Sequence, residues 1–168
     1  MSIVEFSQAL YDSDIGTGIR ESLYLFPAIE GTHLLSLAFS VGLILLTDLR
    51  LVGIFLKDVP ASDILLRLRP WVLGGFAVQF LTGILLFWAE GATVVKLAVF
   101  WLKIFVIFVA GLNVLWFEIK WVRHVGDWDN QAVPPNTVRL IGWASLTFWA
   151  VVVISGRLLP YLSNYYRT

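Results

Sequence analysis

The chain has 168 residues, of which 58% are hydrophobic, 15% are aromatic and only 14% are charged, and its mean hydropathy is +0.80. A soluble domain of this size does not need so much apolar surface, so the composition indicates an integral membrane protein. A formal net charge of zero argues against nucleic acid as a partner, and the absence of cysteine excludes disulfides and thiolate metal sites. Met1 is the only methionine, which excludes a copper(I) pathway built on sulfur ligands.

Residues 1–22 are expected to form an amphipathic segment in the membrane interface. They lack the basic region, apolar core and small-residue cleavage site of a signal peptide. Apolar residues such as Ile3, Phe6 and Leu10 fall roughly at helical spacing, which predicts one short interfacial helix. The run Asp12 to Gly18 should end this helix, and a frayed polar terminus is the alternative.

Residues 23–168 are expected to form an all-α transmembrane domain, a bundle of four helices. Four apolar segments have close to the roughly 20 residues that cross about 30 Å of hydrocarbon. They run from about 24 to 47, 71 to 89, 97 to 117 and 140 to 162. The connections between them are too short to hold a soluble domain, so the bundle should be the whole of the folded structure beyond residue 22.

The basic residues outside the spans predict the orientation, because cytoplasmic loops retain lysine and arginine. The first and third connections carry most of them, and few lie on the other side. The first and third connections carry Arg50, Lys57, Arg67, Arg69, Lys120, Arg123 and Arg139. The other side carries Arg20, Lys96 and Arg167. We therefore expect a multi-pass protein of the bacterial inner membrane with both termini on the periplasmic side.

Ionisable residues inside the spans fall at similar depths. Ionisable groups in hydrocarbon are costly and are kept mostly where they have a function. His33 lies about nine residues, or roughly 13 Å, below the outer end of the first span, and Lys103 and Arg157 lie at comparable depth in the third and fourth spans. Glu30 is one turn nearer the surface, and Trp88 closes the second span at the same end. We expect one polar site in the outer leaflet; the alternative is that Lys103 and Arg157 extend to the headgroups.

Small and polar residues share the helix face of His33 and suggest a slot there. Ser36 and Ser40 lie three and seven positions beyond His33, and the second span has a matching stripe with Gln79 at its centre, which is Gly75, Gln79, Thr82 and Gly83. Such stripes allow close approach of two helices or leave room for a flat ligand, and both interpretations stay open.

Haem b would suit one imidazole with flanking cations, because a neutral histidine is a common axial ligand and basic residues can pair with propionates. His33 is the candidate iron ligand, and Glu30, Lys103 and Arg157 would orient the ring or hold the propionates. His124 cannot be the second ligand, because it belongs to the predicted loop on the opposite side of the membrane.

The inner ends of the first and third spans carry their own polar set. We expect an ion pair there, either Asp48 with Lys120 or Arg50 with Glu118, that fastens the two helix ends, and a buried Asn113 amide that bonds to backbone. These residues are interpreted as structural.

The order of these residues resembles a known group of proteins. His33 in the first span, Asp48-Leu49-Arg50 at its exit, Gly83, Leu102-Lys103 and Gly156-Arg157 resemble an uncharacterised bacterial family of four-helix membrane proteins, over about residues 22–162. That family is distantly similar to the membrane domain of the copper-resistance D proteins and to the haem-containing protoporphyrinogen oxidase of the HemJ type.

The resemblance to the HemJ type implies a histidine in the first helix that binds haem b and a lysine in the third helix, both important to activity. His33 and Lys103 match these positions. This chain departs from the enzyme in having no second histidine in any span, and Glu30-x-x-His33 and Gly156-Arg157 belong to the uncharacterised group.

We predict a membrane haem b protein for electron transfer or redox sensing, with Ser36, Ser40, Gln79 and Trp88 lining the site. The alternatives are a HemJ-like oxidase or quinone-linked reductase, a quinone or lipid pocket without haem, and a cofactor-free accessory subunit of a larger complex. We expect the chain to contact the lipid bilayer and to form a homo-oligomer or join a membrane complex.

Overall fold

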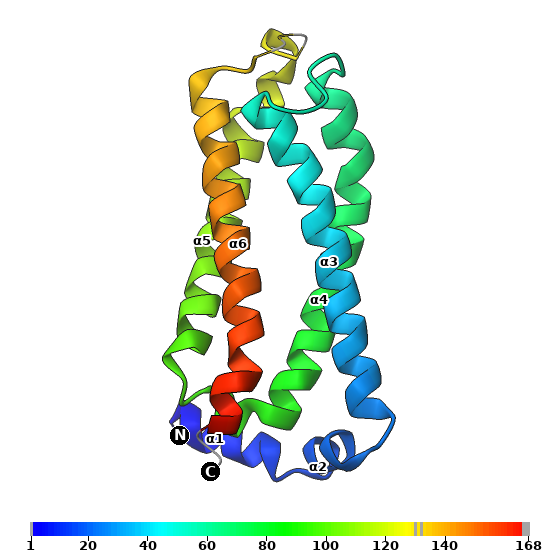
Figure 1. The fold of residues 1–168 in the computed structure, drawn as a ribbon, viewed down its shortest axis with the longest axis vertical. Coiled ribbons are helices and arrows are strands. Elements are labelled where there is room, and N and C mark those ends of the chain that lie inside the picture. The colour runs from blue at the N-terminus through cyan, green and yellow to red at the C-terminus, as the bar shows by residue number, and fades with distance from the viewer. Residues whose placement is uncertain (1, 130, 132, 166–168) are drawn as a thin grey trace.

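The computed structural model describes residues 2–129, 131 and 133–165, with side chains through residue 163, and its regular structure is entirely helical. Two short helices, α1 (Ile3–Tyr11) and α2 (Asp14–Glu21), precede four long ones (Figure 1). The long helices are α3 (Leu25–Val52), α4 (Ala61–Val94), α5 (Ala98–Lys120) and α6 (Asn136–Tyr165), and a 3₁₀ helix, η1 (Val122–Asp127), follows α5. All four long helices are apolar enough to cross a membrane, which confirms the predicted fold class of an all-α membrane protein with four spans.

The helices extend beyond the apolar segments that predicted them. Helix α4 begins at Ala61, ten residues before the predicted start at Trp71, and passes through Pro70. Hydropathy finds only the part of a helix that is apolar, and the first turns of α4 carry Arg67 and Arg69. The first connection is therefore mostly helix, and the true loop between α3 and α4 is short.

The N-terminal segment has two helices where the sequence predicted one. The run that was expected to end the helix instead starts α2, because the Ser13 hydroxyl accepts a hydrogen bond from the Gly16 N–H at 3.1 Å and caps the new helix. Trp88 of α4 donates to the same hydroxyl at 2.9 Å, and Arg20 donates to the carbonyl of Ala89 at 3.3 Å. These bonds hold the segment against the end of α4.

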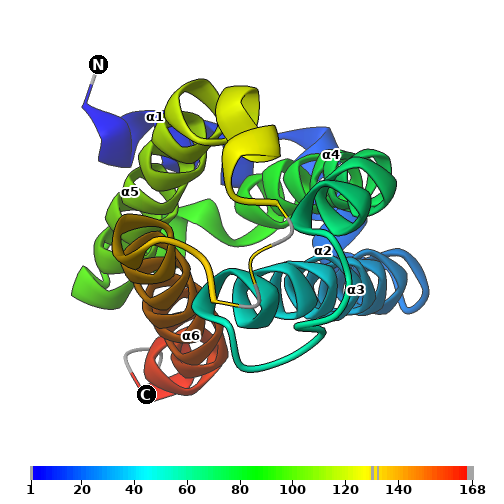
Figure 2. The same cartoon turned by 90° about the horizontal axis from the view of Figure 1, so that it is seen from above.

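The long helices are arranged as two hairpins, α3 with α4 and α5 with α6. Helix α3 also packs on α6, and this is the main contact between the hairpins (Figures 1 and 2). We call the end where α1, α2 and the α4–α5 turn lie the terminal end, and the end with the α3–α4 and α5–α6 connections the loop end. In Figure 1 helices α3 and α6 lie close together at the loop end and separate toward the terminal end.

Glycine 142 allows the close contact of the hairpins at the loop end. A Cβ atom at Gly142 would lie 3.0 Å from the Val52 side chain and 3.2 Å from the Asp48 carbonyl oxygen, so the α6 backbone lies directly on α3. One apolar cluster fills the loop end around Leu51, Phe117 and Trp128, and a second lies further along the bundle around Val106, Trp149 and Val152.

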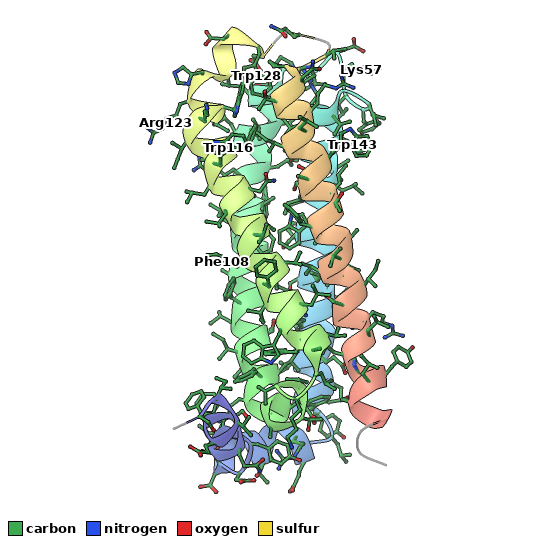
Figure 3. All side chains as sticks on the ribbon, turned by 90° about the vertical axis from the view of Figure 1, so that its left-hand side faces the viewer. Lys57, Phe108, Trp116, Arg123, Trp128 and Trp143 are labelled. Carbon is green, nitrogen blue, oxygen red and sulfur yellow. The ribbon has the colours of Figure 1, made fainter. Side chains whose placement is uncertain are left out.

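The outer surface of the bundle is apolar, as contact with lipid requires. Large hydrophobic side chains such as Leu35, Trp71, Phe105 and Phe108 are more than half exposed. Figure 3 shows Phe108 at mid-height on α5, with Trp116 and Trp128 toward the loop end, where tryptophan is favoured near the headgroups.

The ion pairs predicted at the loop end are wrong. Glu118 pairs with Arg69 of α4 at 2.6 Å, so it is not the partner of Arg50. Arg50 is only 1% exposed and donates to three loop carbonyls, those of Val59, Asp129 and Gln131, at 2.8 to 3.2 Å.

Asp48 is also buried, at 5% exposure, and among the described residues its Oδ2 atom has no hydrogen-bond partner. Lys120 is exposed and forms no ion pair with it. The prediction for Asn113 is confirmed, because its amide donates to the carbonyl of Ile141 at 3.3 Å.

Candidate functional site

His33 projects from the first third of α3 toward α4, where both of its ring nitrogens are hydrogen-bonded. The Nδ1 atom lies 2.9 Å from the Thr82 hydroxyl, and the Nε2 atom lies 2.8 Å from the amide nitrogen of Gln79. Thr82 and Gln79 are three residues apart and therefore share one face of α4. The imidazole thus bridges the two helices of the first hairpin in its terminal half.

The neighbours of His33 determine its tautomer. The Gln79 amide nitrogen can only donate, so ring Nε2 accepts and the ring proton lies on Nδ1. Nδ1–H then donates to the Thr82 oxygen, whose own hydroxyl donates to the carbonyl of Val78 at 2.8 Å. The Gln79 carbonyl oxygen accepts from Ser36 at 2.6 Å. The network is complete with a neutral imidazole.

Lys103 lies in the second hairpin and, unlike His33, is not held by side-chain hydrogen bonds to any residue that the structure describes. It is partly buried, and among the described residues its ammonium group has no hydrogen bond and no ion pair. It is nevertheless close enough to His33 for the two groups to interact electrostatically. The first and second hairpins therefore present an imidazole and an ammonium group to the same region of the bundle.

Two glycines make room for these side chains. A Cβ atom at Gly83 of α4 would lie 3.3 Å from His33 Cε1, and one at Gly156 of α6 would lie 3.2 Å from Lys103 Nζ. In each hairpin, an ionisable side chain of the first helix packs against a glycine of the second helix. The close approach at Gly83 is to a ring held at both nitrogens, whereas the one at Gly156 is to the end of a flexible side chain.

Of the other residues predicted to line the site, some contact His33 and some lie elsewhere in the bundle. Ser36 and Gln79 belong to the His33 network, as described. Ser40 is fully buried against Gly75, and its hydroxyl has no partner among the described residues. Trp88 bonds to Ser13 and fastens the N-terminal helices.

Glu30 and Arg157 do not join His33. Glu30 is exposed, and the described residues give it no hydrogen bond to the ring. Arg157 is exposed as well; it donates to the Tyr161 hydroxyl at 3.1 Å and lies over the Tyr161 ring at 5.3 Å. Arg157 therefore follows the alternative in which a long basic side chain extends toward the membrane surface.

Sequence reasoning missed Thr82 as a member of the site. Thr82 was part of the small and polar stripe on the second span, yet only Gln79 of that stripe was named as a site residue. The available signal was the spacing: Thr82 lies one turn from Gln79, so a side chain that reaches one of them can reach the other.

One of the two ring nitrogens of His33 could bind haem iron. Histidines that bind metals usually donate their second ring N–H to a protein acceptor, which fixes the ring. His33 does so through Nδ1 to Thr82, leaving Nε2 as the nitrogen for iron. Nε2 accepts from Gln79 in this structure, so iron binding requires the Gln79 side chain to turn away. The unpaired Lys103 ammonium fits a propionate.

The chain was compared with known proteins by sequence and by structure. No curated protein and no solved structure matches it significantly. The profile of a family of unknown function, DUF6644, matches residues 14–162, which include every long helix up to the last turn of the fourth span and all the site residues described above. The chain is a member of the DUF6644 family.

Proposed function

We propose that this protein binds haem b between its two hairpins, in the terminal half of the bundle, and serves in electron transfer or redox sensing. His33 would hold the haem iron through Nε2, and Lys103 would pair with a propionate. The observation that carries the proposal is the arrangement of a neutral imidazole, oriented by Thr82, within electrostatic range of an ammonium group that has no counter-ion among the described residues.

The unpaired Lys103 supports an anionic ligand in particular. Even a partly buried ammonium group without a partner is unfavourable, and in membranes such groups usually pair or mark a ligand site. A propionate would give Lys103 a charge-assisted hydrogen bond. Haem would supply one-electron redox chemistry, while this chain supplies the ligand, the counter-charge and an apolar surrounding.

The test is the absorption spectrum of the detergent-purified protein, oxidised and reduced. We expect a Soret band that is lost in His33→Ala and weakened, through lower haem occupancy, in Lys103→Met. The matched controls are His124→Ala and Lys96→Met, which remove the other histidine and an exposed lysine at the terminal end. A colourless native protein after haem supplementation, or an unchanged band in His33→Ala, would contradict the proposal.

Gln79 provides a second test of the same site. Because its amide occupies Nε2, Gln79→Ala should free that nitrogen and raise haem affinity. Loss of haem in Gln79→Ala would mean that this side chain helps to bind the ligand.

A quinone site without haem is the second candidate function, and the satisfied His33 network favours it. An apolar groove of about 470 Å³ between α3 and α4 is lined by Phe39, Trp71, Gly75 and Val78 and includes Ser36, which bonds to Gln79. A quinone could enter this groove from the lipid. Quinone extracted from colourless protein, and its loss in Ser36→Ala, would support this function over haem.

If the protein is instead an oxidase or a quinone-linked reductase, Lys103 would contact an anionic substrate. Lys103→Met would then keep the spectrum and abolish turnover. No described contact favours this reaction over electron transfer.

We further propose that the loop end lies in the cytoplasm and the terminal end in the periplasm of a bacterial inner membrane. The excess of basic residues at the loop end supports this orientation. The chain has no cysteine, so single substitutions such as Asp58→Cys and Lys96→Cys need no background removal. A membrane-impermeant thiol reagent added to intact cells should label position 96 and not position 58; the reverse pattern would invert the topology.

A further inference from the structure

A hollow at the loop end lies apart from the His33 site and has an unusual set of side chains. It has a volume of about 370 Å³ and is lined by Lys120, Trp121, His124, Asp127, Trp128 and Gln131. This volume is at the lower end of the range for small-ligand sites. The residues come from the last turn of α5, from η1 and from the segment that follows it.

The hollow lies beside the ends of two candidate spans, where lipid headgroups are expected. Helix α5 is a candidate span that ends at Lys120, and the next span begins at Asn136, so the hollow lies between the ends of two spans. Figure 3 shows Trp128, Trp116 and Arg123 at this end of the bundle. Tryptophan and basic side chains at span ends are typical of the region where headgroups lie.

Lys120 and Asp127 line the same hollow without binding each other. The ion pair found among the described residues is that of Arg69 with Glu118, and it includes neither group. Lys120 instead lies over the Trp116 ring at 5.8 Å, and both Lys120 and Asp127 are exposed. A cation and an anion that share a hollow and remain unpaired can receive a ligand that carries both charges.

The acceptors in the hollow select the kind of cation. The His124 Nδ1 atom lies 3.1 Å from the carbonyl of Lys120, so the proton of the neutral ring is on Nδ1 and Nε2 is an acceptor. The Gln131 amide nitrogen donates to the Asp127 carbonyl at 3.4 Å, which leaves its side-chain oxygen as a second acceptor. With the Asp127 carboxylate, three acceptors line one hollow. A primary ammonium group has three N–H donors to match them, whereas a choline group has none.

Donors for a phosphate are present as well. Lys120 carries a positive charge, and Trp121 has a buried indole N–H without a partner among the described residues. Such an unsatisfied donor calls for an explanation, which a bound ligand would supply.

We propose that this hollow binds the headgroup of phosphatidylethanolamine, with the ammonium group at Asp127, His124 and Gln131 and the phosphate at Lys120. The lipid is the source of the ligand because the hollow opens at headgroup depth, where acyl chains can lie along the apolar face of α5. The site is separate from the proposed haem site and does not depend on it.

The test is native mass spectrometry of the detergent-purified protein with dioleoyl phosphatidylethanolamine or dioleoyl phosphatidylcholine at equal concentration. The two lipids share their chains and phosphate, so any difference reports the ammonium group. We expect at least about tenfold more ethanolamine lipid bound, because choline can make none of these hydrogen bonds and the loss of one charge-assisted hydrogen bond already predicts about a tenfold difference. Equal binding of the two lipids to the native protein would overturn the proposal.

Three variants at two positions separate the roles of the charged residues. Asp127→Asn should remove the preference for ethanolamine, and Asp127→Glu should retain it. Lys120→Gln should weaken the binding of both lipids by a similar factor of about ten and keep the preference for ethanolamine, because it removes the contact with the phosphate that both lipids share. Loss of preference in Lys120→Gln alone, or an unchanged preference in Asp127→Asn, would overturn these roles.

The control variants are Lys57→Gln and Asp58→Asn, which remove an exposed cation and an exposed anion from the other connection at the same end. They should leave the binding of both lipids unchanged. If they reduced binding as much as the Asp127 and Lys120 variants do, loop charge in general, and not this hollow, would attract the lipid. Free phosphoethanolamine at the lipid concentration should not displace the lipid. Displacement would overturn the lipid as the source.

Discussion

In the hairpin α3–α4, the His33 ring packs against Gly83, and in the hairpin α5–α6 the Lys103 ammonium packs against Gly156. The first group has a hydrogen bond at each of its polar atoms, to Thr82 and to Gln79. The second has none among the described residues. In each hairpin an ionisable side chain on the first helix packs against a glycine on the second. The hairpins differ in whether the polar atoms of that side chain have hydrogen-bond partners.

This difference assigns separate roles to the two hairpins. A satisfied network fixes its members in one geometry and adds to stability, whereas an unsatisfied buried charge is unfavourable until a ligand pairs with it. The α3–α4 hairpin therefore behaves as a finished structural unit that presents one imidazole. In the α5–α6 hairpin, the described residues provide no partner for the Lys103 ammonium group.

The largest expected effect is that of His33→Ala on the ligand-free protein. The substitution removes the ring from its place between two helices and leaves Gln79 and Thr82 without a partner. We expect a loss of about 3 kcal/mol in the free energy of unfolding. The measurement is reversible unfolding in mixed micelles. Glu30→Ala, one turn away and exposed, is the control and should change stability by less than about 0.5 kcal/mol.

Lys103→Met should have the opposite sign. Methionine keeps the length of the side chain and removes the unpaired charge, so the ligand-free protein should gain about 1 to 2 kcal/mol in the same unfolding assay. A loss of stability in this variant would indicate that Lys103 has a counter-ion in the folded chain. The comparison of the two hairpins would then no longer hold.

Much of this fold could be predicted from the sequence, because lipid imposes a strong requirement on composition. Four apolar segments identify four spans, and the helix end most in error, at Ala61, lies where α4 continues into a polar segment that carries Arg67 and Arg69. Hydropathy carries no signal there. The second N-terminal helix was missed because a short Ser-Asp-x-Gly sequence can end one helix or cap the next.

The candidate site was predicted in part. Depth along each span identified His33 and Lys103, since rise per residue is nearly constant in a helix. Depth does not report rotation about the helix axis, and this is why Arg157 and Glu30, at similar heights, lie outside the site. The pairing of Asp48 and Arg50 failed for a related reason: the loops fold back over the helix end and supply carbonyl groups that no local pattern reveals.

Replacing Gly83 or Gly156 by alanine tests how firmly the opposite side chain, His33 or Lys103, is held in place. In Gly83→Ala the new methyl group would meet an imidazole that is held at both nitrogens, so we expect a loss of about 1 kcal/mol. In Gly156→Ala the methyl group would meet the end of a flexible lysine side chain that can move aside. This change should be near neutral, because alanine also favours the helix. Equal losses in the unfolding assay would mean that Lys103 is as firmly held as His33.

The smallest expected effect concerns the ion pair that joins the hairpins. Arg69 of α4 and Glu118 of α5 are 56% and 34% exposed, and exposed pairs contribute little after the entropy of the side chains is counted. We expect Arg69→Gln to reduce stability by less than about 0.5 kcal/mol, and this loss should become smaller as salt is added, because salt screens exposed charges. Gly142→Val is the contrasting variant at the same end, because it would separate α6 from α3 and should destabilise by about 2 to 3 kcal/mol. If Arg69→Gln were the more damaging change, the hairpins would be held together by charge at their ends, and the apolar contact of α3 with α6 would be secondary.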